Sequence, residues 1–195
     1  MMLLEKRKQE EYYSLTFTKM AKKKERTIEI PEGIATTIEG TIVKIKGEKG
    51  ELQKEFCYPG VSLKQESNKI TIAAETACKK HRSVVGTYES HLKNMFKGVT
   101  EGYTATMKAV YAHFPITIKQ AENVIEVHNF LGEKVPRKGK IHGDAQVKIQ
   151  KDDVTIEGIN KEDVGQTAAN IELATRIKNK DTRVFQDGVY ITQKP

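Results

Sequence analysis

Two short clusters of lysine and arginine are the residues of this sequence whose type and spacing could do chemistry. The first follows Glu133 in a segment with two glycines and a proline, and its members are Lys134, Arg137, Lys138 and Lys140. The second is relieved only by Asp181, and its members are Arg176, Lys178, Lys180 and Arg183. Glycine-containing loops with such cations can follow a phosphate backbone, and guanidinium groups bind phosphate in a bidentate way. The clusters predict a nucleic-acid interface, with an ordinary solvated surface as the alternative.

Catalytic and metal-binding patterns are absent from the sequence. The histidines form no H-x-x-x-H or H-E-x-x-H pattern, and Cys57 and Cys78 lie 21 residues apart, which is no typical ligand spacing. Nucleophile-elbow, P-loop and dinucleotide-binding glycine motifs are missing too. We therefore expect no catalytic residue, no metal and no cofactor. An enzyme whose histidine and acidic groups come together across domains stays open as a competing class, as does a protein-binding scaffold without RNA.

Composition and charge limit the remaining classes. The chain has 195 residues, a formal net charge of +7 and a mean hydropathy of −0.56. Its apolar runs are too short to cross a bilayer, which argues against a membrane partner. Two cysteines cannot build a disulfide framework, so we expect a reduced, cytoplasmic setting. The second half is almost neutral, and local clustering therefore indicates the binding region better than net charge does.

The elements that must position the clusters follow from hydrophobic periodicity. Alternating apolar residues from Thr27 onward predict short, half-buried strands, for example over 103–111. One stretch instead has apolar residues at three- and four-residue spacing, and Gly98 and Gly102 mark its end. We expect this stretch to be a long helix, with an apolar stripe made of Val84, Tyr88, Leu92, Met95, Phe96 and Val99.

The second half repeats the order of the first. Gly132 follows Gly47 by 85 residues, and Thr155 follows Thr71 by 84. After several strands comes a second predicted helix, for which Asn160 is a suitable N-cap. Its apolar face consists of Val164, Ala168, Ile171 and Thr175, and a closing strand contains Val184, Val189 and Ile191. Duplication of one β-rich unit explains this order, with chance similarity as the alternative. We place the domains at 27–114 and 115–195, because Pro115 interrupts the strand pattern.

Residues 1–26 are expected to form an N-terminal extension outside both domains. The charged residues that follow the first four leave no apolar core for a secretory signal. Two explanations fit the segment: a disordered extension, or a start assigned too early, with Met20 as the true first residue.

Several segments together resemble a known family. The segment 154–171 is similar to the carboxyl-terminal domain of the L-six family of large-subunit ribosomal proteins. Segments 30–33, 83–87 and 94–103 are similar to signatures of its first domain. The ending 181–191, without a lysine- and glycine-rich tail, resembles the archaeal and eukaryotic branch, and the small size favours the archaeal type.

The resemblance implies an α+β fold of two similar tandem domains, each an antiparallel sheet with a packed helix. It also implies a non-enzymatic constituent of the cytoplasmic ribosome that supports subunit assembly and translation. Its partners would be large-subunit rRNA and neighbouring ribosomal proteins, with no small-molecule substrate. In the family the second domain grips rRNA near the sarcin-ricin loop and the factor-binding region. The candidate rRNA-binding residues are Gln166, Asn170, Arg176, Lys178, Lys180, Arg183, Arg137, Lys138 and Lys140.

Overall fold

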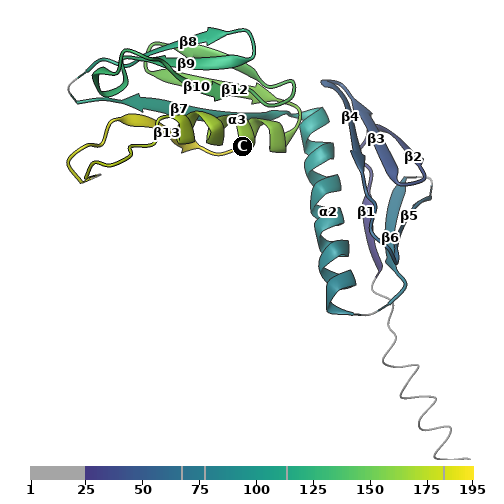
Figure 1. Cartoon of the computed structure of the whole chain (residues 1–195). Helices are drawn as coiled ribbons and strands as arrows, with labels where there is room; N and C mark the ends of the chain where they lie inside the picture. The colour runs from purple at the N-terminus through teal and green to yellow at the C-terminus, as the bar shows by residue number, and fades with distance from the viewer. Residues whose placement is uncertain (1–24, 67, 77, 113, 182) are drawn as a thin grey trace, which may run out of the picture. The chain divides into compact units, whose positions relative to one another are not determined.

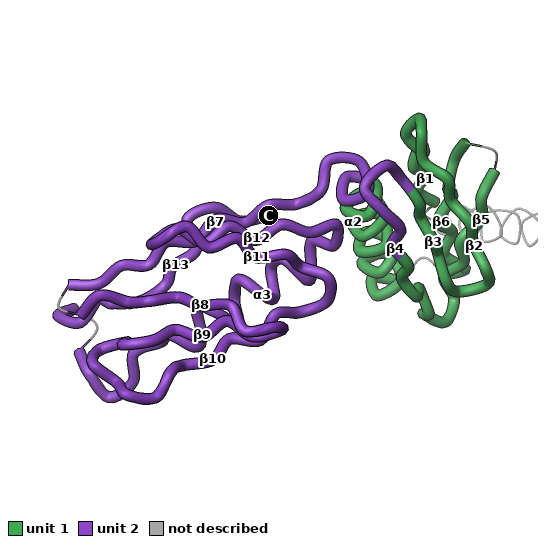
Figure 2. The backbone as a smooth tube through the Cα atoms, turned by 90° about the horizontal axis from the view of Figure 1, so that it is seen from above, with its two compact units in different colours: residues 1–46, 53–96 green, residues 47–52, 97–195 purple. Residues whose placement is uncertain are grey.

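The structure, a computed structural model of the chain, describes residues 25–66, 68–76, 78–112, 114–181 and 183–195 (Figure 1). The expected extension 1–26 lies outside the described residues, except for Glu25 and Arg26, which begin the first strand. Two compact units are present. The first comprises residues up to 46 together with 53–96, and the second comprises 47–52 and 97–195 (Figure 2). No helix of the described residues is long and apolar enough to span a membrane.

The first unit is built on two antiparallel three-stranded sheets. One has the order β1-β6-β5, from strands β1 (Glu25–Glu29), β5 (Val61–Glu66) and β6 (Lys69–Ala74). The other is the meander β2 (Ala35–Glu39), β3 (Ile42–Gly47) and β4 (Gly50–Glu55), of which the turn between β3 and β4 and the first half of β4 are grouped with the second unit. Alternation places Ile70 and Ile72 of β6 in the core, and Ile28 of β1 is paired with Ile70 in register. The predicted period-two strands are confirmed here.

The long helix α2 (Lys79–Thr100) confirms the predicted apolar stripe, with one shift. Tyr88, Leu92, Met95, Phe96 and Val99 are buried as expected. At the start of the stripe, however, Val85 is 0% exposed and Val84 is only half-buried. Successive helical residues are rotated by about 100°, so Val84 lies at the margin of the face that Val85 and Leu92 share. The chain leaves the helix at Gly102, which has φ +78.

The second unit contains a four-stranded antiparallel sheet of order β11-β12-β7-β13 and a three-stranded sheet β10-β9-β8. The large sheet consists of β7 (Tyr103–Val110), β11 (Gln146–Gln150), β12 (Asp153–Gly158) and β13 (Gly188–Gln193). The small sheet consists of β8 (Thr117–Ala121), β9 (Val124–His128) and β10 (Arg137–Lys140), with the short helix η1 (Phe130–Gly132) between β9 and β10. Helix α3 (Lys161–Ala174) contacts β7, β10, β12 and β13, and its residue Ile171 is fully buried.

The order of elements repeats between the units and confirms the expected α+β fold of two similar domains. The meander β2-β3-β4 corresponds to β8-β9-β10, and β5, β6 and α2 correspond to β11, β12 and α3. Strand β1 pairs with β6 in the first unit, and β7 pairs with β12 in the same way in the second.

The grouping of strands differs from the expected boundary between residues 114 and 115. A boundary at Pro115 puts strand β7 in the first domain, because β7 precedes that proline. In the structure, β7 is hydrogen-bonded on one edge to β12 and on the other to β13, so it belongs to the second compact unit. Periodicity identifies a strand but carries no information about its pairing partner. The expected closing strand is also shorter, because Val184 is 73% exposed and its N–H donates to the Asp181 carbonyl in a turn before β13.

Helix α3 begins with the predicted cap, which gives a direct stability test. The Asn160 side chain accepts a hydrogen bond from the Glu162 N–H at 3.1 Å, satisfying one of the free N–H groups of the first turn. Replacing Asn160→Ala should lower the free energy of unfolding by about 1 kcal/mol. Urea denaturation followed by circular dichroism measures this change. Asn160→Ser is the control, since its hydroxyl also accepts; an equal loss in both variants would contradict capping as the cause.

Candidate nucleic-acid interface

The first basic cluster lies on a strand and not in the loop that its glycine and proline content predicted. Its residues from Arg137 to Lys140 form β10, which pairs with β9 along its whole length. Side chains of a strand alternate between two faces, so Lys138 and Lys140 share one face and Arg137 and Gly139 the other. Gly139 faces α3, where an added Cβ would lie 3.2 Å from the Ile171 Cα. Lys138 and Lys140 are therefore exposed on the face of β10 turned away from α3.

Arg137 is held inside the protein by hydrogen bonds on all sides of its guanidinium. Nε and Nη2 donate to the two Glu133 carboxylate oxygens at 2.9 and 2.7 Å. Nη1 donates to the backbone carbonyls of Ala174 and Arg176 at 3.2 and 2.9 Å. The group also lies over the Phe130 ring, 4.3 Å from its centroid. Because arginine has five N–H donors and these bonds use four, Arg137 retains little capacity for a phosphate.

The position of Arg137 links the two clusters. By binding the Ala174 carbonyl, it satisfies one of the last carbonyls of α3, which have no partner within the helix, and it also binds the Arg176 carbonyl just beyond the helix. The same bonds fix the backbone where the second cluster begins. The structure therefore brings the two clusters together through Arg137, and the charge of Lys180 also acts on Glu133 beside the first cluster.

Cations of the first cluster lower the pKa of two carboxyl groups. Hydrogen bonds from Arg137 hold the pKa of Glu133 below its ordinary value. On the opposite face, the Lys138 ammonium lies 3.2 Å from Glu126 and lowers the pKa of that carboxyl, mainly through their hydrogen bond. Lys138 is thus partly neutralised, whereas Lys140 is exposed.

The predicted helix residues Gln166 and Asn170 form one polar chain. Gln166 Nε2 donates to Asn170 Oδ1 at 2.8 Å, and Asn170 Nδ2 donates to the Lys140 carbonyl, also at 2.8 Å. This chain ties α3 to β10 beside the close packing of Gly139. The Asn170 amide thus uses its oxygen and one N–H within the protein, while Gln166 is exposed and keeps its carbonyl oxygen for a ligand.

The second cluster, which we name the 176–183 segment, follows α3 and is anchored at both ends. At the start, Thr175 Oγ1 accepts from the Val189 N–H at 3.1 Å. Near the end, Asp181 Oδ1 accepts from the Arg183 N–H at 2.9 Å, and Lys180 Nζ lies 4.7 Å from the Phe185 ring centroid. Arg176, Lys178 and Arg183 are exposed. Among the described residues, no acidic group forms an ion pair with these three side chains, which leaves their charge available to an outside anion.

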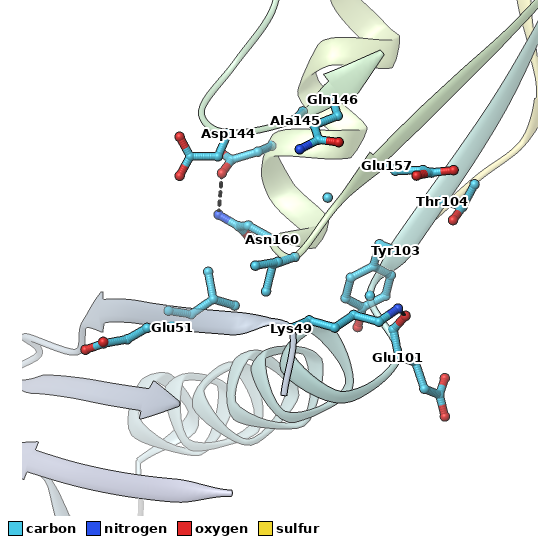
Figure 3. Close-up of a pocket in the computed structure, with 15 residues that line it drawn as sticks. Lys49, Glu51, Glu101, Tyr103, Thr104, Asp144, Ala145, Gln146, Glu157 and Asn160 are labelled. Atoms are coloured by element: carbon cyan, nitrogen blue, oxygen red, sulfur yellow. Dashed lines mark hydrogen bonds between the residues drawn. The ribbon is translucent and has the colours of Figure 1, made fainter. Parts of the chain in front are cut away.

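One pocket of the second unit is lined by more carboxylates than cations, which is the wrong charge for phosphate. It measures about 590 Å³, and the labelled carboxylates of Glu51, Glu101, Asp144 and Glu157 belong to its lining (Figure 3). One cation, Lys49, lines it too, and its Nζ donates to the Glu101 carbonyl. Like charges repel, so a polyanion is disfavoured there. In the part of the chain that the structure describes, no group of three His, Cys, Asp or Glu side chains is arranged to hold a metal.

A second pocket escaped sequence reasoning. It measures about 500 Å³ and adjoins the 176–183 segment. We name it the Tyr190 pocket, and its lining includes Leu173, Thr175, Arg176, Ile177, Phe185 and Tyr190. The available sequence signal is the pair of aromatic residues close to a basic cluster, but their exposure depends on how β13 lies beside the end of α3.

Arg137 allows a test of the electrostatics of the first cluster. Removing its guanidinium with Arg137→Gln should raise the pKa of Glu133 toward its ordinary value of 4.5. In the native protein, the lowered pKa of Glu133 stabilises the fold at pH values above the ordinary pKa. This stabilisation is lost as the pH falls through the folded-state pKa. The variant should therefore lose less stability on acidification. Carboxyl NMR titration and acid unfolding measure both effects. Arg183→Gln is the control, and a Glu133 pKa unchanged by Arg137→Gln would contradict the assignment.

Comparison with known proteins agrees with this two-unit structure. A family model described as Ribosomal protein L6 matches residues 30–102 and 114–188. The two matched segments begin 84 residues apart (114 − 30), as the sequence offsets predicted. The break between them lies close to Pro115, so the sequence repeat and the compact units divide the chain at different places.

Individual relatives are similar over almost their full length. Large ribosomal subunit protein uL6 of Methanocella arvoryzae is 48% identical over 176 residues, which are 90% of this chain and 99% of the relative. The protein of the same name from Methanosarcina mazei is 47% identical over 175 residues, with the same shares. That of Methanospirillum hungatei is 49% identical over 170 residues, 87% of this chain and 97% of the relative. With a family match over most of its length, this chain belongs to the archaeal-type L6 family of non-enzymatic ribosomal proteins.

Proposed function

We propose that this protein is a structural constituent of the large ribosomal subunit and that its second unit binds rRNA near the sarcin-ricin loop and the factor-binding region. Membership of the L6 family, whose relatives are named as large-subunit proteins, supports the place of action. The observation that carries the RNA interface is the exposure of Arg176, Lys178 and Arg183, for which no ion pair with an acidic group of the described residues is found. Neighbouring large-subunit proteins are the other partners, and the protein contributes to subunit assembly and translation.

The candidate residues divide into two roles. Those whose cations face outward neutralise phosphates directly, and they are Arg176, Lys178, Lys180, Arg183, Lys138 and Lys140. Gln166 adds an uncharged contact from the exposed side of α3. Arg137 and Asn170 act mainly as positioning residues, because their polar groups bind the Arg176 and Lys140 carbonyls. Phosphate contacts of this kind fix the register of a protein on RNA without reading its sequence.

The location on rRNA is tested by footprinting. The native chain, bound to a large-subunit rRNA fragment that contains the sarcin-ricin stem, should protect backbone positions in or next to that stem from hydroxyl radicals. A fragment from a distant rRNA domain is the control and should stay unprotected at equal protein concentration. Protection elsewhere with none near the stem would disprove the location, and absence of the native protein from salt-washed large subunits would disprove the ribosomal role.

The 176–183 segment is tested by the salt dependence of binding. Replacing its four cations by glutamine should flatten the slope of log K against log salt concentration by roughly 0.7 to 0.9 per lost phosphate contact. The matched control removes equal charge from exposed lysines elsewhere in the second unit, namely Lys108, Lys119, Lys148 and Lys151. An equal change of slope in both variants would show a general charge effect and remove the segment from the interface.

A further inference from the structure

The Tyr190 pocket combines an aromatic wall with a cationic border. Two of its lining residues, Phe185 and Tyr190, carry aromatic rings, and Leu173 and Ile177 add aliphatic surface. Arg176 lines the same pocket and begins the 176–183 segment. Glu172 is the acidic residue in the lining of the pocket. Such a surface favours a ligand that is flat and apolar on its faces and joined to negative charge.

The Tyr190 ring is held in place before any ligand arrives. Its hydroxyl donates to the Gln186 carbonyl at 3.2 Å. Behind the ring lies Gly188, where an added Cβ would approach the ring carbons to 3.0 Å, so the absent side chain makes room for it. Tyr190 is nevertheless 43% exposed. A fixed and partly exposed ring loses little conformational freedom when it stacks on a ligand.

The positive charge beside the Tyr190 pocket indicates which kind of ligand the pocket favours. The 176–183 segment has four cations against Asp181, and Lys180 lies over Phe185 itself. This border repels a basic protein surface and attracts a polyanion. Among polyanions, a single-stranded nucleic acid has exposed bases that stack on aromatic side chains, whereas paired bases inside a helix are inaccessible.

We infer that the Tyr190 pocket binds one unpaired nucleobase of the rRNA, stacked against Tyr190, while the flanking phosphates lie on Arg176 and its basic neighbours. The inference rests on the proposed function and adds a stacked base to an interface whose charged residues contact phosphates. Tyr190 thereby supplies a contact that is independent of the salt-dependent term.

Base-specific chemical probing tests the inference. With the native protein, an unpaired base in the bound rRNA should become protected from dimethyl sulfate or carbodiimide. Tyr190→Leu keeps apolar volume but removes the ring, so that base should become reactive again while the hydroxyl-radical footprint persists. Tyr190→Phe should retain the protection. Tyr190→Ala should weaken binding roughly 5- to 100-fold at constant salt, as expected for the loss of one stacked base.

A control variant is available, and two different outcomes would contradict the inference. Tyr111, at 39% exposed, is a matched tyrosine of the second unit outside the pocket, and Tyr111→Leu should change no base protection. If Tyr190→Leu leaves every base protection and the affinity unchanged, the pocket holds no base and is free or covered by a protein; the proposed function then survives and this inference does not. If the native chain gives no footprint on the rRNA, both fail together.

Discussion

The pairing of β7 on both of its edges is the constraint on which the second unit depends. β12 binds one edge and β13 the other, in antiparallel register, so β7 holds together elements from distant parts of the sequence. Its inward residues, among them Ala105 and Met107, are almost wholly buried in the core that α3 covers. The positions of α3, of the 176–183 segment and of Tyr190 all follow from this sheet, because each is attached to β12 or β13 or packed against them.

Local elements could be predicted from sequence because their signals are local. Ile70 and Ile72 alternate as a half-buried strand requires, and Asn160 precedes an amphipathic stretch as an N-cap should. Val84 was expected in the apolar stripe but lies at its margin, because three- and four-residue spacing alone does not define the angular width of the buried face. Strand partners were not accessible in this way: the pattern of 103–111 is the same whichever sheet the strand joins, and only the tertiary structure places β7 beside β12.

The candidate site was less predictable, because the role of a cation depends on what lies near it in space. Arg137 is close to Glu133 in sequence, but the carbonyls that bind its Nη1 belong to Ala174 and Arg176. Its basic neighbours therefore suggested an RNA ligand, where the structure has an internal clamp. Gly139 suggested a flexible loop, although it is a strand residue whose missing side chain allows α3 to approach. Tyr190 had only the weak signal of an aromatic residue near a basic cluster, since its exposure depends on how β13 lies beside the end of α3.

The pairing of β7 with β13 also has a consequence for folding during translation. Strand β7 is synthesised long before β13, so a growing polypeptide exposes one edge of β7 until β13 has emerged. Contacts between such distant segments form late and slowly. A chain that stops before Gly188 would carry every cation of the 176–183 segment but no strand to hold the end of that segment. The geometry of the basic surface at the 176–183 segment therefore depends on the presence of β13.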